Sequence, residues 1–144
     1  MADLPDADLA RFSRLFGALD EPGRKRLLAR ATRRTCRADE TVFKEGDRGT
    51  DFFVVVKGRV QVSGDDLGNS VTLATLLPGQ FFGEVAVLSG QPRQATVTAL
   101  EPTELLGFPA EAIDEALREA PGARAVLQKV GLARTEDALQ KLMR

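Results

Sequence analysis

The feature that most constrains the fold is a series of short apolar strands separated by glycine turns, between residues 41 and 109. The clearest strand is Phe52–Val56, after which Lys57–Arg59 reverses the chain into Val60–Val62. β-Branched and aromatic residues favour strands, and a glycine between two such runs is typical of a tight hairpin. Closely spaced short strands of this kind predict an antiparallel sandwich or barrel.

Helical patterns flank this strand-rich part. Before it, residues 6–34 are expected to form two helices, of which the second begins near Asp20 and runs to about Arg34. After it, residues 110–143 are expected to be helical, with a break at Pro121-Gly122. The sequence therefore predicts one α+β domain over residues 1–144, in which an antiparallel β-roll (a double-stranded, jelly-roll-like barrel) spans residues 41–109.

The residue types that the chain lacks narrow its chemistry. It has no His and a single cysteine, Cys36. Because His is the commonest general base and metal ligand, we expect no catalytic residues, no metal site and no enzymatic activity. The net charge of −1 gives no general attraction to nucleic acid or membranes. No signal peptide or membrane-spanning run is recognisable, so a cytoplasmic location is expected.

The residues expected to bind a ligand lie in one segment, Phe81–Val97. Gly83 lets the backbone approach a ligand closely, and the short helical turn predicted after it would offer free N–H groups to an anion. Arg93 adds a permanently charged fork that suits a phosphodiester. Glu84 would repel phosphate, but its carboxylate could accept a hydrogen bond from a sugar hydroxyl. Taken alone, Glu84 and Arg93 could instead form a structural salt bridge across the loop.

This segment resembles the phosphate-binding cassette of the cyclic nucleotide-binding domain family. The family pattern is Phe-Gly-Glu-x-Ala, a short gap, and then Pro-Arg-x-Ala-Thr/Ser-Val. Both halves are present, as Phe82–Ala86 and Pro92–Val97. The similarity extends upstream to Val42–Asp47 and Phe53–Val60, and in all it covers roughly residues 10–140. The resemblance implies a β-roll flanked by helices, acting as a non-catalytic sensor.

Carried over by position, the resemblance gives the residues of this segment their roles. Arg93 would pair with the exocyclic phosphate oxygens, and Glu84 would accept a hydrogen bond from the ribose 2′-hydroxyl. Backbone N–H groups of Gly83, Ala86 and Gln94 would complete the cradle. The ligand-binding residues that the resemblance implies are Gly83, Glu84, Val85, Ala86, Arg93, Gln94 and Ala95.

The implied ligand is a cyclic nucleotide monophosphate, and no cofactor is expected. Family members selective for cyclic GMP often have Thr or Ser directly after the arginine, whereas this chain has Gln94, which favours cyclic AMP over cyclic GMP. The resemblance also implies signalling through movement of the C-terminal helix. That helix could form a homodimer contact, and the effector protein is unknown. No DNA-binding domain and no membrane partner are expected.

An alternative function remains open at this point. The chain could be a protein-interaction or dimerisation module that keeps the fold but no longer senses a nucleotide. A run of basic residues is relevant here, and it comprises Arg24, Lys25, Arg26, Arg30, Arg33, Arg34 and Arg37. Such a run could contact an acidic partner or nucleic acid, but few aromatic residues are interleaved with it. We expect it to form a solvated helix face.

Overall fold

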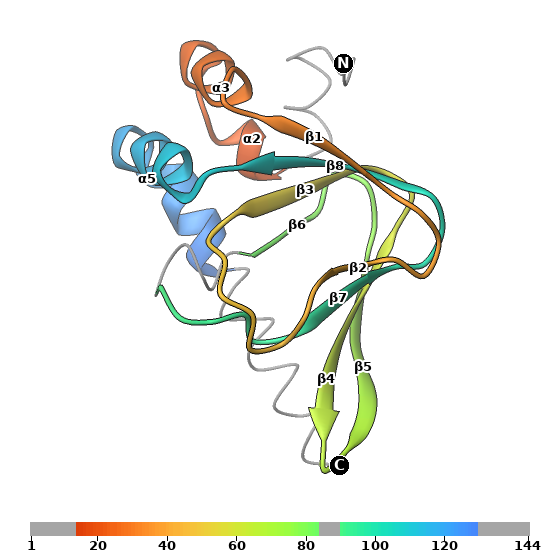
Figure 1. Ribbon diagram of the computed structural model, residues 1–144. Coiled ribbons are helices and arrows are strands. Elements are labelled where there is room, and N and C mark those ends of the chain that lie inside the picture. The colour runs from red at the N-terminus through yellow and green to blue at the C-terminus, as the bar shows by residue number, and fades with distance from the viewer. Residues whose placement is uncertain (1–13, 84–89, 130–144) are drawn as a thin grey trace.

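The computed structural model of the chain describes residues 14–83 and 90–129. In this part of the chain, eight strands come between two groups of helices in sequence order, and the helices lie together in space (Figure 1). The helices are α2 (Arg14–Gly17), α3 (Glu21–Leu28) and α5 (Ala110–Glu119), and residues 121–129 are also helical. The strands are β1 (Thr32–Cys36), β2 (Thr41–Phe43), β3 (Phe52–Lys57), β4 (Val60–Asp66), β5 (Asn69–Leu76), β6 (Phe81–Phe82), β7 (Thr96–Ala99) and β8 (Thr103–Phe108).

The strands form two open four-stranded antiparallel sheets rather than a closed barrel. One sheet has the strand order β1-β8-β3-β6, and the other has the order β2-β7-β4-β5. Figure 1 shows α2, α3 and α5 gathered beside the first sheet, while β4 and β5 extend away from them. Antiparallel sheets with helices grouped at the chain ends confirm the predicted α+β class and the β-roll.

Strand β3 separates two hydrophobic cores. Successive side chains of a strand point to opposite faces, and here both faces are covered. Phe52 and Val54 belong to a core shared with α2, α3 and α5, which we call the helix-side core. Phe53 and Val55 belong to a core between the two sheets, the inter-sheet core. All four residues are buried, which explains why this strand is a continuous apolar run rather than an alternating one.

The second N-terminal helix is shorter than predicted. It begins after Asp20, whose carboxylate accepts a hydrogen bond from the Gly23 N–H at 2.8 Å, and it ends at Leu28. The prediction of helix as far as Arg34 is wrong, because Thr32–Cys36 forms β1 and pairs with β8. β1 lies at the edge of its sheet, where charged residues are common, so the basic run concealed a strand.

The basic run is consequently divided between α3 and β1, and part of it pairs with acids of β8 and α5. The pairs, with their N···O distances, are Arg26–Glu119 (2.5 Å), Arg33–Glu104 (2.7 Å) and Arg30–Glu111 (3.9 Å). Arg26 and Glu119 have side chains that are 61% and 64% exposed. The expected solvated face is therefore present on α3, where it carries ion pairs to a neighbouring helix.

The C-terminal helices break one residue before the predicted position, and Pro121 and Gly122 already belong to the next helix. α5 ends at Glu119, and Ala120 is not helical, with φ −138° and ψ 81°. A further helix covers residues 121–129, in which Leu127 is fully buried in the helix-side core. The predicted continuation of this helix to residue 143 lies outside the described residues.

Candidate functional site

Arg93 lies between β6 and β7, and its backbone is tied to the loop between β2 and β3. The Arg93 N–H donates to the carbonyl oxygen of Asp47 at 2.9 Å, and the Gly46 N–H donates to the Arg93 carbonyl oxygen at 2.8 Å. Two backbone hydrogen bonds of opposite direction fix the position of this residue. The loop Lys44–Asp51 therefore forms one wall of the site.

The Arg93 side chain is held inside the protein against that wall. It is 6% exposed, and its Nη2 donates to the carbonyl oxygen of Asp51 at 2.9 Å. Its Cζ atom lies 4.1 Å from the centroid of the Phe43 ring, within the range of a cation–π interaction. A hydrogen bond and an aromatic face thus hold one buried cation.

Two hydrogen-bonding groups of Arg93 are left open by this arrangement. Nε and Nη1 are buried and make no hydrogen bond in the part of the chain that the structure describes. Burial lowers the pKa of Arg93, while the negative charges of Asp51 and Asp47 act in the opposite direction and raise it. A guanidinium nevertheless stays protonated, so it is a buried cation with unused donors. Such a group is suited to an anion with several acceptor oxygens.

Gly83 lies directly beside this guanidinium. Its backbone φ is +92°, a value that residues with a β-carbon rarely adopt. A β-carbon at this position would lie 2.7 Å from the Asp51 carbonyl oxygen and 3.1 Å from Arg93 Nη1. The predicted glycine is therefore required for two reasons, its backbone conformation and the close approach of Asp51. The structure brings Gly83 and Arg93 together, as the sequence predicts.

The other predicted site residues are only partly placed. Glu84, Val85 and Ala86 lie outside the described residues. Gln94 is exposed, and its Nε2 donates to the carbonyl oxygen of Pro92 at 3.1 Å. Ala95 is partly buried, immediately before β7. The ligand-binding roles of all seven residues remain predictions, and the structure shows only that Gly83 and Arg93 lie together.

Three residues of the site were missed by the sequence reasoning. Phe43 lies in the segment Val42–Asp47, which was noted only for its resemblance to the family, and neither Gly49 nor Asp51 was given a role in the site. A β-carbon on Gly49 would lie 3.2 Å from Arg93 Nη2, so this glycine also gives the guanidinium room. Asp51 contributes its backbone carbonyl oxygen, and because every residue has one, the amino-acid type at this position gives no sign of the contact. Gly49 was the one available signal of close packing, since a β-carbon on Gly46, the other glycine of the loop, would have nothing within 4 Å.

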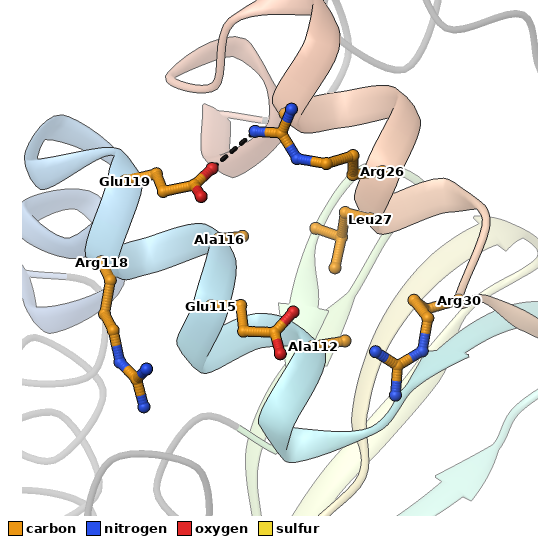
Figure 2. A pocket seen from close by; sticks show the side chains of 9 residues that line it. Arg26, Leu27, Arg30, Ala112, Glu115, Ala116, Arg118 and Glu119 are labelled. Carbon is orange, nitrogen blue, oxygen red and sulfur yellow. Dashed lines mark hydrogen bonds and ion pairs between the residues drawn. The ribbon is translucent and has the colours of Figure 1, made fainter.

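A hollow lies between α3 and α5, with a volume of about 230 Å³. Figure 2 shows Glu115 and Arg30 facing each other across it, with the Arg26–Glu119 ion pair at one end. Leu27 contributes an apolar wall. The lining includes none of the predicted site residues. We therefore place the candidate site at Arg93 and not at this hollow.

Metal binding, a reactive thiol and a membrane-spanning helix were also considered for the described residues. None of their His, Cys, Asp and Glu side chains form a group that could hold a metal ion. Cys36 is buried, and its burial raises the pKa of the thiol, which is the opposite of what a reactive thiolate needs. Among residues 14–83 and 90–129, no helix has the length and apolar character needed to cross a membrane.

Comparison with known proteins links this site to a family. Residues 33–120 match the family model described as "Cyclic nucleotide-binding domain". The chain is also similar to a cAMP-dependent protein kinase regulatory subunit of Yarrowia lipolytica, with 35% identity over 91 residues. That alignment covers 63% of this chain and 23% of the relative. The chain thus spans about a quarter of the length of this relative.

Solved structures of two other proteins have a similar fold. The catabolite activator protein of Thermus thermophilus superposes with a TM-score of 0.78 and 31% identity, covering 90% of this chain and 62% of that chain. The regulatory domain of Toxoplasma gondii PKA, solved with cAMP, superposes with a TM-score of 0.72 and 27% identity. This second match covers 77% of this chain and 44% of that chain.

Proposed function

Because the chain belongs to the cyclic nucleotide-binding domain family, we propose that it is a regulatory sensor domain that binds a 3′,5′-cyclic nucleotide. The observation that carries the proposal is the environment of Arg93, whose Nε and Nη1 are buried without a partner in residues 14–83 and 90–129. A buried donor without a partner is energetically unfavourable, and a charged one more so. The phosphate of a cyclic nucleotide supplies both the acceptor oxygens and the opposite charge.

The rest of the cassette would hold the sugar and complete the phosphate cradle. Gly83 lies beside the guanidinium, and the backbone N–H groups of Gly83, Ala86 and Gln94 are proposed to bind the same phosphate. Glu84 is proposed to accept a hydrogen bond from the ribose 2′-hydroxyl, which is the one free hydroxyl on the ribose of such a nucleotide. Val85, Ala86 and Ala95 would line the same cradle.

Cyclic AMP is the proposed ligand, ahead of cyclic GMP. The position after the arginine often carries Thr or Ser in members selective for cyclic GMP, and this chain has Gln94 there. The Gln94 amide donates to the Pro92 carbonyl oxygen and lies 3.4 Å from Oε1 of Gln91. Because the Gln94 amide hydrogen-bonds within its own loop, we propose that this residue makes no contact with a guanine base.

The proposed signal is a movement of the C-terminal helix. Ala120 interrupts the helical run after α5, so the segment beyond it has a place at which to change direction. Leu127 of this segment packs in the helix-side core, so a movement of the helix would have to change that packing. The readout would be an effector protein or a second copy of the chain, in the cytoplasm.

The test is a calorimetric titration of the protein with cyclic AMP, cyclic GMP and 2′-deoxy cyclic AMP. We expect cyclic AMP to bind most tightly and the 2′-deoxy analogue to bind more weakly, because it lacks the hydroxyl assigned to Glu84. Absence of binding to all three would contradict the sensor function and favour a protein-interaction or dimerisation module. Conversion of the cyclic nucleotide to its open monophosphate during the titration would contradict the non-catalytic role.

A further inference from the structure

We infer that Phe43 is a positioning residue for Arg93, because its ring fixes the plane in which the guanidinium presents Nε and Nη1 to an anion. The identity of that anion rests on the proposed function, whereas the contact itself does not. Arg93 Cζ lies 4.1 Å from the Phe43 ring centroid, and Arg93 is only 6% exposed. Cation–π attraction is strongest where water is excluded in this way.

The Phe43 ring is held in place by its neighbours. Phe43 is the last residue of β2 and pairs with Val97 of β7. Its ring centroid lies 5.8 Å from that of Phe82 and 6.3 Å from that of Phe53. Phe53 and Phe82 stack on each other at 5.1 Å with an interplanar angle of 20°. Contacts from β3, β6 and β7 therefore hold the ring that lies under the guanidinium.

Among residues 14–83 and 90–129, the remaining contacts of Arg93 do not define the guanidinium plane. The hydrogen bond from Nη2 to the Asp51 carbonyl oxygen fixes one nitrogen, and the group could still rotate about that contact. Gly49 and Gly83 approach from the sides, where a β-carbon would lie 3.2 Å from Nη2 and 3.1 Å from Nη1. Both are glycines and offer no side chain to orient the charge. An aromatic face at 4.1 Å supplies the missing restraint.

The first test needs no nucleotide. The Arg93 Nε–H signal is measured by proton–nitrogen NMR in the ligand-free protein and assigned by its loss in Arg93→Lys. We expect slow exchange of this proton with solvent in the wild type and in Phe43→Tyr, which keeps the ring. In Phe43→Leu the exchange should become several-fold faster. Unchanged exchange in Phe43→Leu would overturn the inference.

The second test measures affinity for cyclic AMP by calorimetry. Phe43→Leu should weaken binding roughly 5- to 30-fold, the equivalent of about 1–2 kcal/mol, and Phe43→Tyr should restore most of it. The matched control is Phe53→Leu, which removes a ring from the same cluster without removing the one under Arg93. It should weaken binding less than Phe43→Leu at a similar loss of thermal stability. Equal weakening by the two leucine variants would indicate a merely structural role.

A double-mutant cycle with Arg93→Ala separates positioning from general damage. If Phe43 acts through the guanidinium, Phe43→Leu should change the affinity of the Arg93→Ala protein much less than that of the wild type. An equal change in both backgrounds would overturn the inference. If the wild type binds no cyclic nucleotide, the proposed function fails, but the exchange measurement still decides the role of Phe43.

Discussion

Arginines occupy opposite environments in two regions of this protein. On α3, Arg26 is 61% exposed at its side chain and pairs with Glu119 at 2.5 Å. At the cassette, Arg93 is 6% exposed and leaves Nε and Nη1 without a hydrogen bond among the described residues. An exposed paired charge adds little to either stability or binding. A buried charge with open donors is destabilising by itself and gains most from a ligand, so the difference supports placing the candidate site at Arg93.

The largest expected effect is on binding, through Arg93. Arg93→Ala should weaken cyclic AMP binding by about 2–5 kcal/mol, a loss of roughly 30-fold or more, because it removes one partner of a desolvated charge pair. Calorimetry measures the affinity, and Arg26→Ala serves as the control that removes an exposed arginine. Equal affinities for the Arg93 variant and the wild type would exclude Arg93 from the binding site.

Glu84 is expected to have the next largest effect, on the sugar end of the ligand. Glu84→Ala should weaken binding of cyclic AMP by about 1–3 kcal/mol, because one hydrogen bond to a charged group is lost. The same substitution should have almost no effect on 2′-deoxy cyclic AMP, which lacks the proposed partner. A similar loss for both nucleotides would remove Glu84 from contact with the 2′-hydroxyl.

Gly83 is expected to matter for stability as well as for binding. Gly83→Ala should lower the free energy of unfolding by about 1–3 kcal/mol, because alanine is strained at φ +92° and its β-carbon would lie 2.7 Å from the Asp51 carbonyl oxygen. Chemical denaturation measures the change. Gly68→Ala is the matched control, since Gly68 has φ +89° with nothing within 4 Å of a β-carbon. A loss of stability no larger than in the control would mean that the Lys44–Asp51 loop shifts to make room for the β-carbon.

The smallest effect is expected on the helix face. Arg26→Ala should lower the free energy of unfolding by less than about 1 kcal/mol, and that loss should shrink as salt is added. Affinity for cyclic AMP should stay at the wild-type value. A change in affinity would show that the ion pair between α3 and α5 is coupled to the cassette, and the two regions would then no longer be independent.

Much of the fold could be predicted, because local patterns and burial agree in most elements. β3 was predicted from its apolar run, and the start of α3 from Asp20. β1 was missed because Thr32–Cys36 carries two arginines, and its strand conformation depends on pairing with β8, more than sixty residues away in sequence. A pattern confined to a short window cannot report such a partner.

The candidate site divides in the same way. Gly83 and Arg93 were predicted from a motif, and the structure brings them together. The contacts that hold Arg93 come from the ring of Phe43 at the end of β2 and from a carbonyl oxygen of Asp51 in the loop that follows. A carbonyl is common to every residue, so its use here could not be anticipated. The predicted contribution of Glu84 lies outside the described residues.

The alternation of β3 between two cores has a consequence for how the sequence can vary in length. Inserting or deleting one residue between Phe52 and Val55 would exchange the side chains facing the helices with those facing the second sheet. Both sets of neighbours would then meet side chains of the wrong shape. The turn at Leu67-Gly68 is exposed, and Leu67 there is 96% exposed, so added residues could loop out into solvent. Length changes should therefore be found in that hairpin turn and be absent from β3.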